Sequence, residues 1–394
     1  MNLEVLSEIA EIHSGAGFPK KYQGETQGDL PFAKVGDISN AKREEGKTIS
    51  RAENYVTKQI AQQLRAKVFP KNSIVFAKIG EAIRKNNRAI TSLPMTFDNN
   101  VMGIIPNAEK VSPQYLYHFL ETVDFYTLAN STTVPSIRKT DMEKLEIPLP
   151  PLEEQKRIAA ILDQADALRR LRQRAIDRLN ELGQAIFYEM FGDPATNPMG
   201  WPTEKCGTLC ERITVGIVVR PASYYQPSGV PAIRGTNIKP SGIDLSDVVY
   251  FSESDNETRL SKTRVWEGDL VIVRSGRPGL AAVVSKGLSG VNSIDVLIAT
   301  PSKHKVKSYF LRDLINSKGG KAIVLSESKG QVQQHFNVGS LSDADLILPP
   351  MRLQTEYELM VSDIERQMTQ LRKGVDRTSD LFGTLQHRAF RGEL

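Results

Sequence analysis

Cysteine, tryptophan and long apolar runs are scarce in this chain of 394 residues. Only Cys206 and Cys210 are present, and no histidine or second cysteine pair near them completes a ligand set, so two ordinary small side chains are favoured over a metal site or a disulfide. No apolar run is long enough to cross a bilayer, and the N-terminal MNLEVLSEIAEIHSG lacks a charged leader followed by an apolar block. We therefore expect a cytoplasmic protein with no membrane partner.

Motifs for catalysis are also missing. The GKT at Gly46 lacks the upstream glycine of a phosphate-binding loop, because residue 41 is alanine. Glu327-Ser328-Lys329 resembles the end of a metal-dependent nuclease motif but has no convincing acidic partner at a strand end, and Asn197-Pro198-Met199 lacks the second proline and aromatic residue of an amino-methyltransferase motif. We expect no catalytic residue and no metal in this chain. The alternatives are a methyltransferase or nuclease with an unrecognised site, or a purely structural coiled-coil adaptor.

The chain does contain two long helical runs. The first follows Pro150-Pro151 and extends from residue 152 to 191, without proline and with its first glycine at Gly183. Apolar residues recur there at heptad spacing among charged residues, which is typical of a helix that buries a narrow strip. The predicted strip, interrupted by Arg172 and Glu189, consists of Ile158, Ala165, Leu179 and Ile186 in one column and Ile161, Leu168 and Leu182 in the other.

The second run begins at Met351, after Leu348-Pro349-Pro350, and has the same pattern 199 residues later. That offset carries Gln155 onto Gln354 and Phe191 onto Phe390, which indicates a tandem duplication. Because each strip needs a partner, we predict that the two helices pair as an antiparallel coiled coil. The second strip is Tyr357, Ile364, Leu371 and Leu385, with Met360 and Leu381 in the other column and poorer residues at 367, 374, 378 and 388.

The two segments between the helices also repeat. Residues 1–147 contain strand-like runs at 30–35, 73–78 and 101–105 and a helical run at 113–129. Residues 193–347 repeat this plan: IHSG at Ile12 matches ITVG at Ile213, and YLYHFLET at Tyr115 matches YFLRDLIN at Tyr309. The predicted class is α+β, with two repeated α/β domains (1–147 and 193–347), each followed by a helical segment (148–192 and 348–394).

This arrangement, together with the charge, points to DNA. The net charge of +5 and the pI near 9.0 favour an anionic partner. A 40-residue helix measures roughly 60 Å at about 1.5 Å per residue, whereas one turn of B-DNA separates half-sites by roughly 34 to 36 Å. Two reading domains on such a spacer could therefore read two short sites separated by unread base pairs.

The sequence resembles the specificity subunit of Type I restriction-modification systems over essentially its whole length. The resemblance lies in IPLPPLEEQKRIAAILD, DRLNELGQAIFYEMFGDP and the terminal HRAFRGEL, together with SIVFAKIG and DLVIVRSGRPG. The second helix departs from the first at its start, with MRLQ at Met351 where the first has LEEQ at Leu152.

The resemblance implies a noncatalytic subunit that reads double-stranded DNA. Similar subunits recruit two adenine methyltransferase (M) subunits, largely through the helices, and two restriction/translocase (R) subunits. AdoMet, ATP and Mg are then expected on those partners and not on this chain. Each target recognition domain would read one half of a split asymmetric target, and the helices would set the spacer.

Candidate DNA contacts lie in loops at matching places of the two domains. Arginine can bond guanine, and asparagine or glutamine adenine, through two hydrogen bonds, although most protein contacts to DNA reach phosphate and sugar. The loops after the central strands contain Lys78, Arg84, Lys85, Asn86, Asn87 and Arg88 in the first domain and Arg274, Ser275 and Arg277 in the second. The loops before the proline entries contain Thr132, Thr133, Ser136, Arg138 and Lys139, and Lys329, Gln331, Gln333, Gln334 and His335. Further candidates are Lys34, Arg220, Arg234 and Asn237. For every one of them, the alternative is an ordinary charged surface position.

Overall fold

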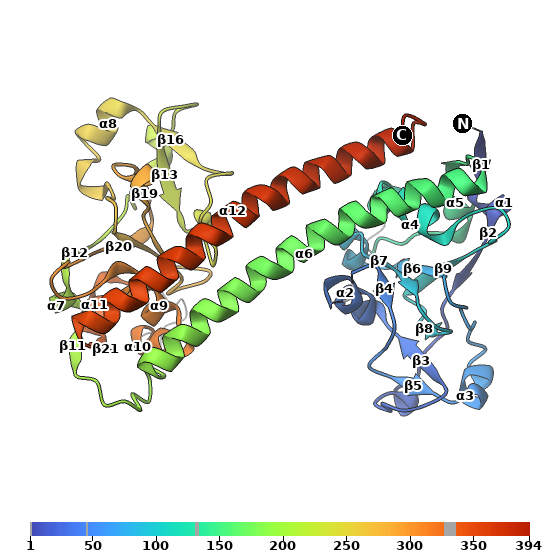
Figure 1. Cartoon of the computed structure of the whole chain (residues 1–394), viewed down its shortest axis with the longest axis horizontal. Helices are drawn as coiled ribbons and strands as arrows, with labels where there is room; N and C mark the ends of the chain where they lie inside the picture. The colour runs from blue at the N-terminus through green and yellow to red at the C-terminus, as the bar shows by residue number, and fades with distance from the viewer. Residues whose placement is uncertain (1, 45, 131–133, 327–335) are drawn as a thin grey trace. The chain divides into compact units, whose positions relative to one another are not determined.

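The computed structural model describes residues 2–44, 46–130, 134–326 and 336–394. The chain divides into two compact units, the first made of residues 1–174 and 372–394 and the second of residues 175–371. Each unit combines a mixed α/β domain with parts of the two long helices α6 and α12 (Figure 1). None of the described helices is long and apolar enough to cross a membrane.

In the first unit, a five-stranded sheet has the order β2-β9-β6-β7-β4, and a three-stranded sheet has the order β5-β3-β8. The pairs β4·β7 and β3·β8 are parallel, whereas the other pairs in these two sheets are antiparallel. A further antiparallel pair, β1·β10, joins the two ends of the domain. The strands are β1 (Leu3–Val5), β2 (Ala10–Ser14), β3 (Leu30–Ala33), β4 (Thr48–Ile49), β5 (Tyr55–Val56), β6 (Ile74–Ala77), β7 (Arg88–Thr91), β8 (Thr96–Phe97), β9 (Val101–Pro106) and β10 (Glu146–Pro148).

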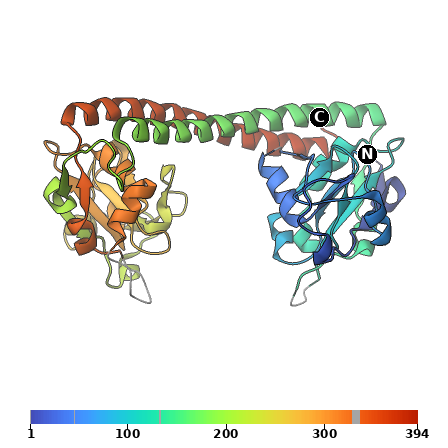
Figure 2. The ribbon, with the colours of Figure 1, turned by 90° about the horizontal axis from the view of Figure 1, so that it is seen from below.

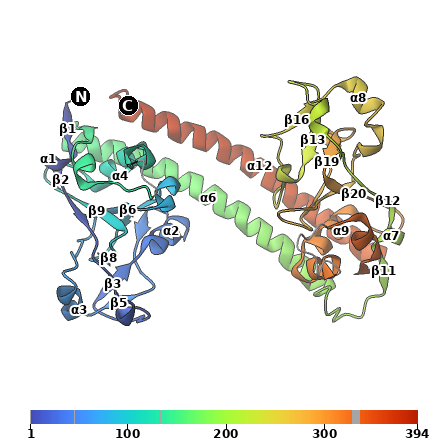
Figure 3. The same cartoon turned by 180° about the vertical axis from the view of Figure 1, so that it is seen from behind.

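The second unit repeats four strands of the five-stranded sheet, in the order β12-β20-β17-β18, together with the three-stranded sheet, β16-β13-β19, and the end pair, β11·β21. Figure 3 shows β13, β16 and β19 beside the short helix α8. A two-stranded sheet, β14·β15, has no counterpart among the described residues of the first unit. The strands are β11 (Thr203–Lys205), β12 (Cys210–Val215), β13 (Val230–Arg234), β14 (Ile238–Lys239), β15 (Gly242–Ile243), β16 (Val249–Phe251), β17 (Leu270–Val273), β18 (Ala281–Val283), β19 (Asn292–Ile294), β20 (Val296–Pro301) and β21 (Asp345–Ile347).

Short helices connect these strands and cover the sheets. In the first unit they are α1 (Leu6–Ile9), α2 (Val35–Glu44), α3 (Lys58–Gln63), α4 (Pro113–Glu121) and α5 (Lys139–Glu143), with 3₁₀ turns η1 (Lys20–Tyr22), η2 (Glu81–Lys85) and η3 (Phe125–Leu128). In the second they are α7 (Cys206–Leu209), α8 (Glu253–Glu257), α9 (Ser308–Asn316), α10 (Lys318–Val324) and α11 (Val338–Asp343), with η4 (Pro221–Tyr224), η5 (Gly235–Asn237), η6 (Ser261–Thr263) and η7 (Lys286–Leu288). The helix predicted over 113–129 is wrong in length, because it ends at Glu121 and η3 is a separate turn capped by Asp124.

A matched glycine explains one of the sequence similarities. A Cβ atom on Gly15 would lie 2.0 Å from the carbonyl oxygen of Asp98, and one on Gly216 would lie 2.6 Å from that of Ser293. Real Cβ contacts do not come so close, so only glycine lets the two backbone segments meet at this place in each domain. The repeat therefore extends to individual close contacts between strands.

The long helices are α6 (Leu152–Phe191) and α12 (Met351–Ala389), and the prolines before each of them mark the helix starts as the sequence predicts. Their pairing is antiparallel in both units (Figure 2). In the first unit, the guanidinium of Arg172 donates to the carbonyl oxygen of Gly374 (2.7 Å), whereas Arg157, earlier in α6, donates to that of Leu394 (2.8 Å). In the second, the rings of Phe187 on α6 and Tyr357 on α12 pack edge to face, with their centroids 5.8 Å apart. The predicted α+β fold with an antiparallel coiled coil is confirmed.

A buried glutamine holds the start of each long helix to its own domain. The Gln155 side chain accepts from the backbone N–H of Ser112 (2.8 Å) and donates to the carbonyl oxygens of Lys110 (3.1 Å) and Pro150 (2.9 Å). The Gln354 side chain accepts from the N–H of Lys307 (3.0 Å) and donates to the carbonyl oxygen of Pro349 (2.8 Å). We call Gln155 and Gln354 the glutamine anchors. They contact the residue that precedes α4 in the first unit and the residue that precedes α9 in the second.

The buried strip of each helix differs from the predicted one in its second column. The first column is at least half-buried throughout, from Ile158 to Ile186 and from Tyr357 to Leu385. In the second column, Leu168, Leu182 and Leu381 are exposed, so this part of the prediction is wrong. The buried residues stand one position later and include Leu162, Ile176, Val361, Met368 and Phe382. Both i+3 and i+4 positions lie near the same helix face, and apolar residues occupy both.

Candidate nucleic-acid interface

The central strand of each domain is followed directly by a basic residue whose side chain lies near an aspartate. After β6, the Lys78 ammonium donates to the Ser14 hydroxyl (2.9 Å); burial lowers the pKa of Lys78, and the nearby Asp98 carboxylate opposes that shift. After β17, the Arg274 guanidinium donates to Asp295 (2.6 Å) and to the carbonyl oxygen of Phe336 (3.2 Å). These paired loop starts fit the predicted equivalence of the two loops.

In the first unit, the loop after β6 continues as η2 and exposes two basic residues. The Arg84 guanidinium lies 3.8 Å from the centroid of the Tyr126 ring, donates to the Tyr126 hydroxyl and pairs with Glu81 (2.8 Å). Lys85 is exposed beside it. Arg84 and Lys85 are thus on the surface, as a DNA contact requires.

Two other candidates in this loop are used inside the domain, and the prediction for them is corrected. Arg88 is 1% exposed, stacks on Phe125 (4.2 Å to the ring centroid) and donates to the carbonyl oxygens of Asn86 (3.2 Å) and Val123 (3.3 Å). Burial lowers the pKa of Arg88 to about 10. The Asn86 amide donates to the carbonyl oxygen of Val123 (3.0 Å) and accepts from the N–H of Phe125 (3.2 Å). Arg88 begins strand β7, which explains its burial.

The neighbouring Asn87 is half-buried, and its amide donates to the Ser39 hydroxyl (3.3 Å).

In the second unit, the matching loop exposes Ser275 and Arg277. The Arg277 guanidinium donates to the carbonyl oxygen of Ile238 (3.2 Å), and Gly276 has a φ of 76°, a conformation that glycine allows. Arg277 therefore has one defined contact and a surface position.

Lys34 and Arg234 occupy equivalent places, where a side chain three residues later accepts from their backbone N–H. Asp37 accepts from Lys34 at 2.7 Å, and Asn237 accepts from Arg234 at 2.9 Å. Asn237 is 2% exposed and also donates to two carbonyl oxygens, so its predicted DNA contact is wrong. The Lys34 ammonium donates to Gln23 (2.7 Å), and the Arg234 guanidinium pairs with the Asp247 carboxylate (3.1 Å).

Of the remaining candidates, Ser136 is half-buried and forms a β-bridge with Ile79, which places it beside the loop after β6. Arg138 and Lys139 are exposed at the start of α5, and Arg220 is exposed before η4. The other predicted residues lie outside the described residues: Thr132, Thr133, Lys329, Gln331, Gln333, Gln334 and His335.

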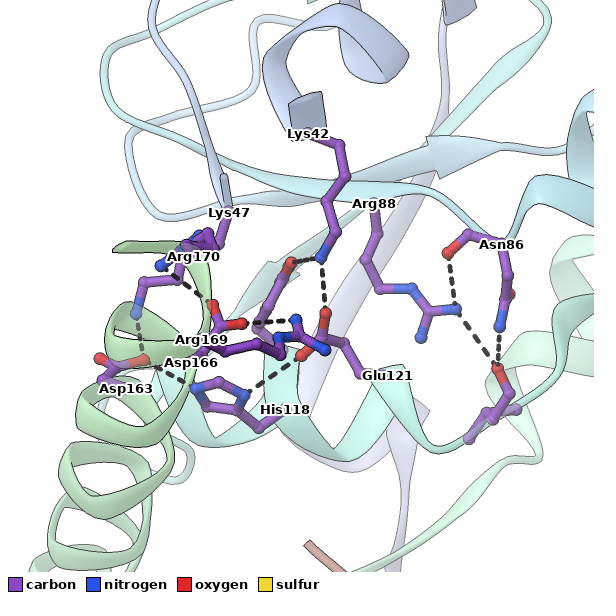
Figure 4. Close-up of polar contacts among 12 residues, drawn as sticks. Lys42, Lys47, Asn86, Arg88, His118, Glu121, Asp163, Asp166, Arg169 and Arg170 are labelled. Atoms are coloured by element: carbon purple, nitrogen blue, oxygen red, sulfur yellow. Dashed lines mark hydrogen bonds and ion pairs between the residues drawn. The ribbon is translucent and has the colours of Figure 1, made fainter. Parts of the chain in front are cut away.

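A buried polar cluster in the first unit was not predicted (Figure 4). His118 of α4 is fully buried and its ring nitrogens contact Asp163 of α6 (2.7 Å) and Glu121 (3.3 Å). Lys42 donates to Glu121 (2.7 Å), and Lys47 pairs with Asp163. These contacts join α4, α2 and the segment before β4 to the long helix.

The protonation of this cluster follows from its contacts. Burial alone would lower the pKa of His118, but its bonds to Asp163 and Glu121 raise it above the usual 6.5. Burial alone would raise the pKa of Glu121, but His118 and Lys42 bring it down to about 2. His118 is therefore held as an imidazolium over a wider pH range than an ordinary histidine.

The second unit has a similar contact at the matching place. Arg312 of α9 pairs with Glu365 of α12 and with Asp313 (2.7 Å), which accepts from the Tyr357 hydroxyl (2.7 Å). The matched segments YLYHFLET and YFLRDLIN place His118 opposite Arg312. A basic residue at one position of both copies was the signal that could have revealed these contacts.

The described residues contain no group of three histidine, cysteine or acidic side chains placed to hold a metal ion. Cys206 and Cys210 are free thiols, and Cys206 is buried.

Comparisons with known proteins agree with this architecture. Residues 4–181 match a family model described as the Type I restriction modification DNA specificity domain. The chain is 23% identical to the Type I restriction enzyme MjaIX specificity subunit of Methanocaldococcus jannaschii, over 100% of this chain and 93% of that protein. It is also 23% identical to the Type I restriction enzyme EcoBI specificity subunit of Escherichia coli, over 99% of this chain and 85% of that protein. The crystal structure of the Type I restriction-modification S subunit from M. genitalium has the same fold, with a TM-score of 0.62 at 12% identity over 99% of this chain and 96% of that one. With its duplicated domains and paired helices, the chain is thus similar over nearly its whole length to Type I restriction enzyme specificity subunits, and its residues 4–181 match their DNA specificity domain.

Proposed function

We propose that this subunit reads a bipartite, asymmetric DNA target, with one recognition domain for each half. The observation that carries the proposal is the duplication, in which two domains share the order of their main sheets and a glutamine anchor to their own long helix. Their loops differ in sequence: Arg84 and Lys85 are exposed in the first domain, and Ser275 and Arg277 in the second. Equal scaffolds with different loops suit a target whose halves differ.

The exposed basic residues would supply both affinity and reading. Arg84, Lys85, Arg138 and Lys139 in the first unit and Arg220 and Arg277 in the second are all exposed. Arginine can bond both acceptors of a guanine edge, whereas lysine adds attraction to phosphate. DNA affinity should therefore fall steeply as salt rises.

We also propose that the chain acts as a noncatalytic scaffold. By family resemblance, it would bind two methyltransferase subunits and two restriction/translocase subunits, which would hold AdoMet, ATP and Mg. The long helices would set the number of unread base pairs, so an extra heptad in the first helix should change the spacer.

The test exchanges residues 1–147 for the corresponding domain of another specificity subunit and maps the methylated sequence of the assembled methyltransferase. One half of the target should change and the other should stay the same. If both halves change, or neither does, the one-domain, one-half assignment fails. Methyl transfer or cleavage by the purified chain alone would overturn the noncatalytic role.

A further inference from the structure

A short apolar segment of the second unit lies next to its basic loop. The N–H of Ile217 donates to the carbonyl oxygen of Ser293 (2.9 Å), and the N–H of Asp295 donates to that of Ile217 (3.1 Å). Asp295 is the residue that holds the Arg274 guanidinium at 2.6 Å. The segment 218–220 follows Ile217 directly, so it begins one residue after the backbone contact to Asp295, the residue that fixes Arg274.

These two valines are exposed although an apolar residue is packed at the same place in the first unit. The side chain of Val218 is 52% exposed and that of Val219 is 78% exposed. The offset of 201 that joins Gly15 to Gly216 also joins Phe18 to Val219, and Phe18 stacks on Phe32 with ring centroids 3.8 Å apart. In the second unit the smaller Ala232 stands in place of Phe32.

The segment is also held in a defined position. Gly216 lies against the backbone of Ser293, where a Cβ atom would lie 2.6 Å from the carbonyl oxygen. Arg220 has a φ of 46°, which is uncommon for a residue other than glycine, and Pro221 follows it. The valines are thus presented by a fixed turn and not by a long loop.

The charges beside the segment favour DNA as the occupant. Arg220 follows the valines directly and is exposed, and Arg274 begins the neighbouring loop. Arg220 and Arg274 bring two positive charges to this place against the one negative charge of Asp295, which favours a partner that carries phosphate. Apolar side chains on such a surface can distinguish thymine by its methyl group, the one apolar feature of the major groove.

We propose that Val218 and Val219 contact a thymine methyl group in the half-site that the second domain reads, and that they are specificity-determining residues. The inference rests on the proposed bipartite reading and adds an apolar contact to it. Loss of one methyl contact should weaken binding about fourfold, the value of burying one methyl-sized group.

The experiment measures binding of the subunit, assembled with its methyltransferase, to duplexes that carry the mapped target. Each thymine of the second half-site is replaced in turn by uracil, which lacks only the methyl group. For the wild type, we expect a loss of about fourfold at one or two thymines. Val219→Ala should bind the unmodified target that much more weakly and should no longer distinguish uracil at those positions.

Val68→Ala in the first unit, where Val68 is 40% exposed, is the matched control and should leave the uracil scan unchanged. If the wild type ignores every uracil, or if Val219→Ala keeps the same scan as the wild type, the valine contact is refuted while bipartite binding stands. If the wild-type complex does not discriminate the mapped target from unrelated DNA, the proposed function itself fails.

Discussion

Removal of a glutamine anchor tests how each recognition domain is joined to its long helix. Gln155→Ala deletes three hydrogen bonds, to Ser112, Lys110 and Pro150, at a buried position. Gln354→Ala deletes two, to Lys307 and Pro349. Both variants leave the backbone in place, so their effects should be local.

The magnitudes follow from the bonds lost. At about 1 kcal/mol for each neutral hydrogen bond, the first variant should lower the local free energy of opening by about 3 kcal/mol and the second by about 2 kcal/mol. Because 1.4 kcal/mol is about a factor of ten, amide exchange should speed up roughly a hundredfold near Ser112 and roughly thirtyfold near Lys307.

Hydrogen exchange read by mass spectrometry compares peptides covering 108–120 and 152–160 with those covering 303–316 and 351–360. Each variant should affect its own pair of peptides and leave the other pair as in the wild type. Gln164→Ala, an exposed position on α6, is the control and should affect neither pair. A change below threefold near Ser112 in Gln155→Ala, or an equal change in both units, would refute the anchor.

Three further predictions follow from single contacts. Because the folded-state pKa of His118 is raised above 6.5, its contribution to stability is complete below about pH 6.5 and is lost as pH rises through the folded pKa. Thermal unfolding of the wild type should therefore show a loss of stability of the first unit as pH rises. His118→Gln should lack this loss, and the second unit, which has Arg312 at the matching place, should not show it. Arg172→Ala removes bonds to α12 and should lower the free energy of unfolding by about 1 to 3 kcal/mol in denaturant titrations, whereas Arg174→Ala at an exposed position should change it little. Arg277→Ala should weaken binding to the second half-site alone in competition assays, and an equal loss on all sequences would mark a phosphate contact instead.

The long helices could be predicted closely because local rules determine them. Two prolines exclude helix before Leu152 and before Met351, and no further proline follows before either helix ends. The second column of the buried strip could not be fixed, because Ile161 and Leu162, like Leu381 and Phe382, are adjacent apolar residues. Which of them faces the partner depends on packing against the domain and the other helix.

The candidate DNA contacts were harder to predict because residue type does not reveal burial. Arg88 reads as a loop arginine, but it begins strand β7 and stacks on Phe125. Asn237 reads as a base-reading amide, but it caps the turn after β13. In contrast, Arg84 and Arg277 lie in turns between elements and are exposed. A long-range contact such as the one between His118 and Asp163 joins residues 45 positions apart, which no local pattern can show.

The most direct test of bipartite reading is methylation mapping of DNA modified by this subunit together with its methyltransferase. If two related domains read separate halves, the methylated motif will consist of two different short sequences separated by a fixed number of unspecified base pairs. A single continuous motif, or two parts separated by a variable gap, would contradict the account.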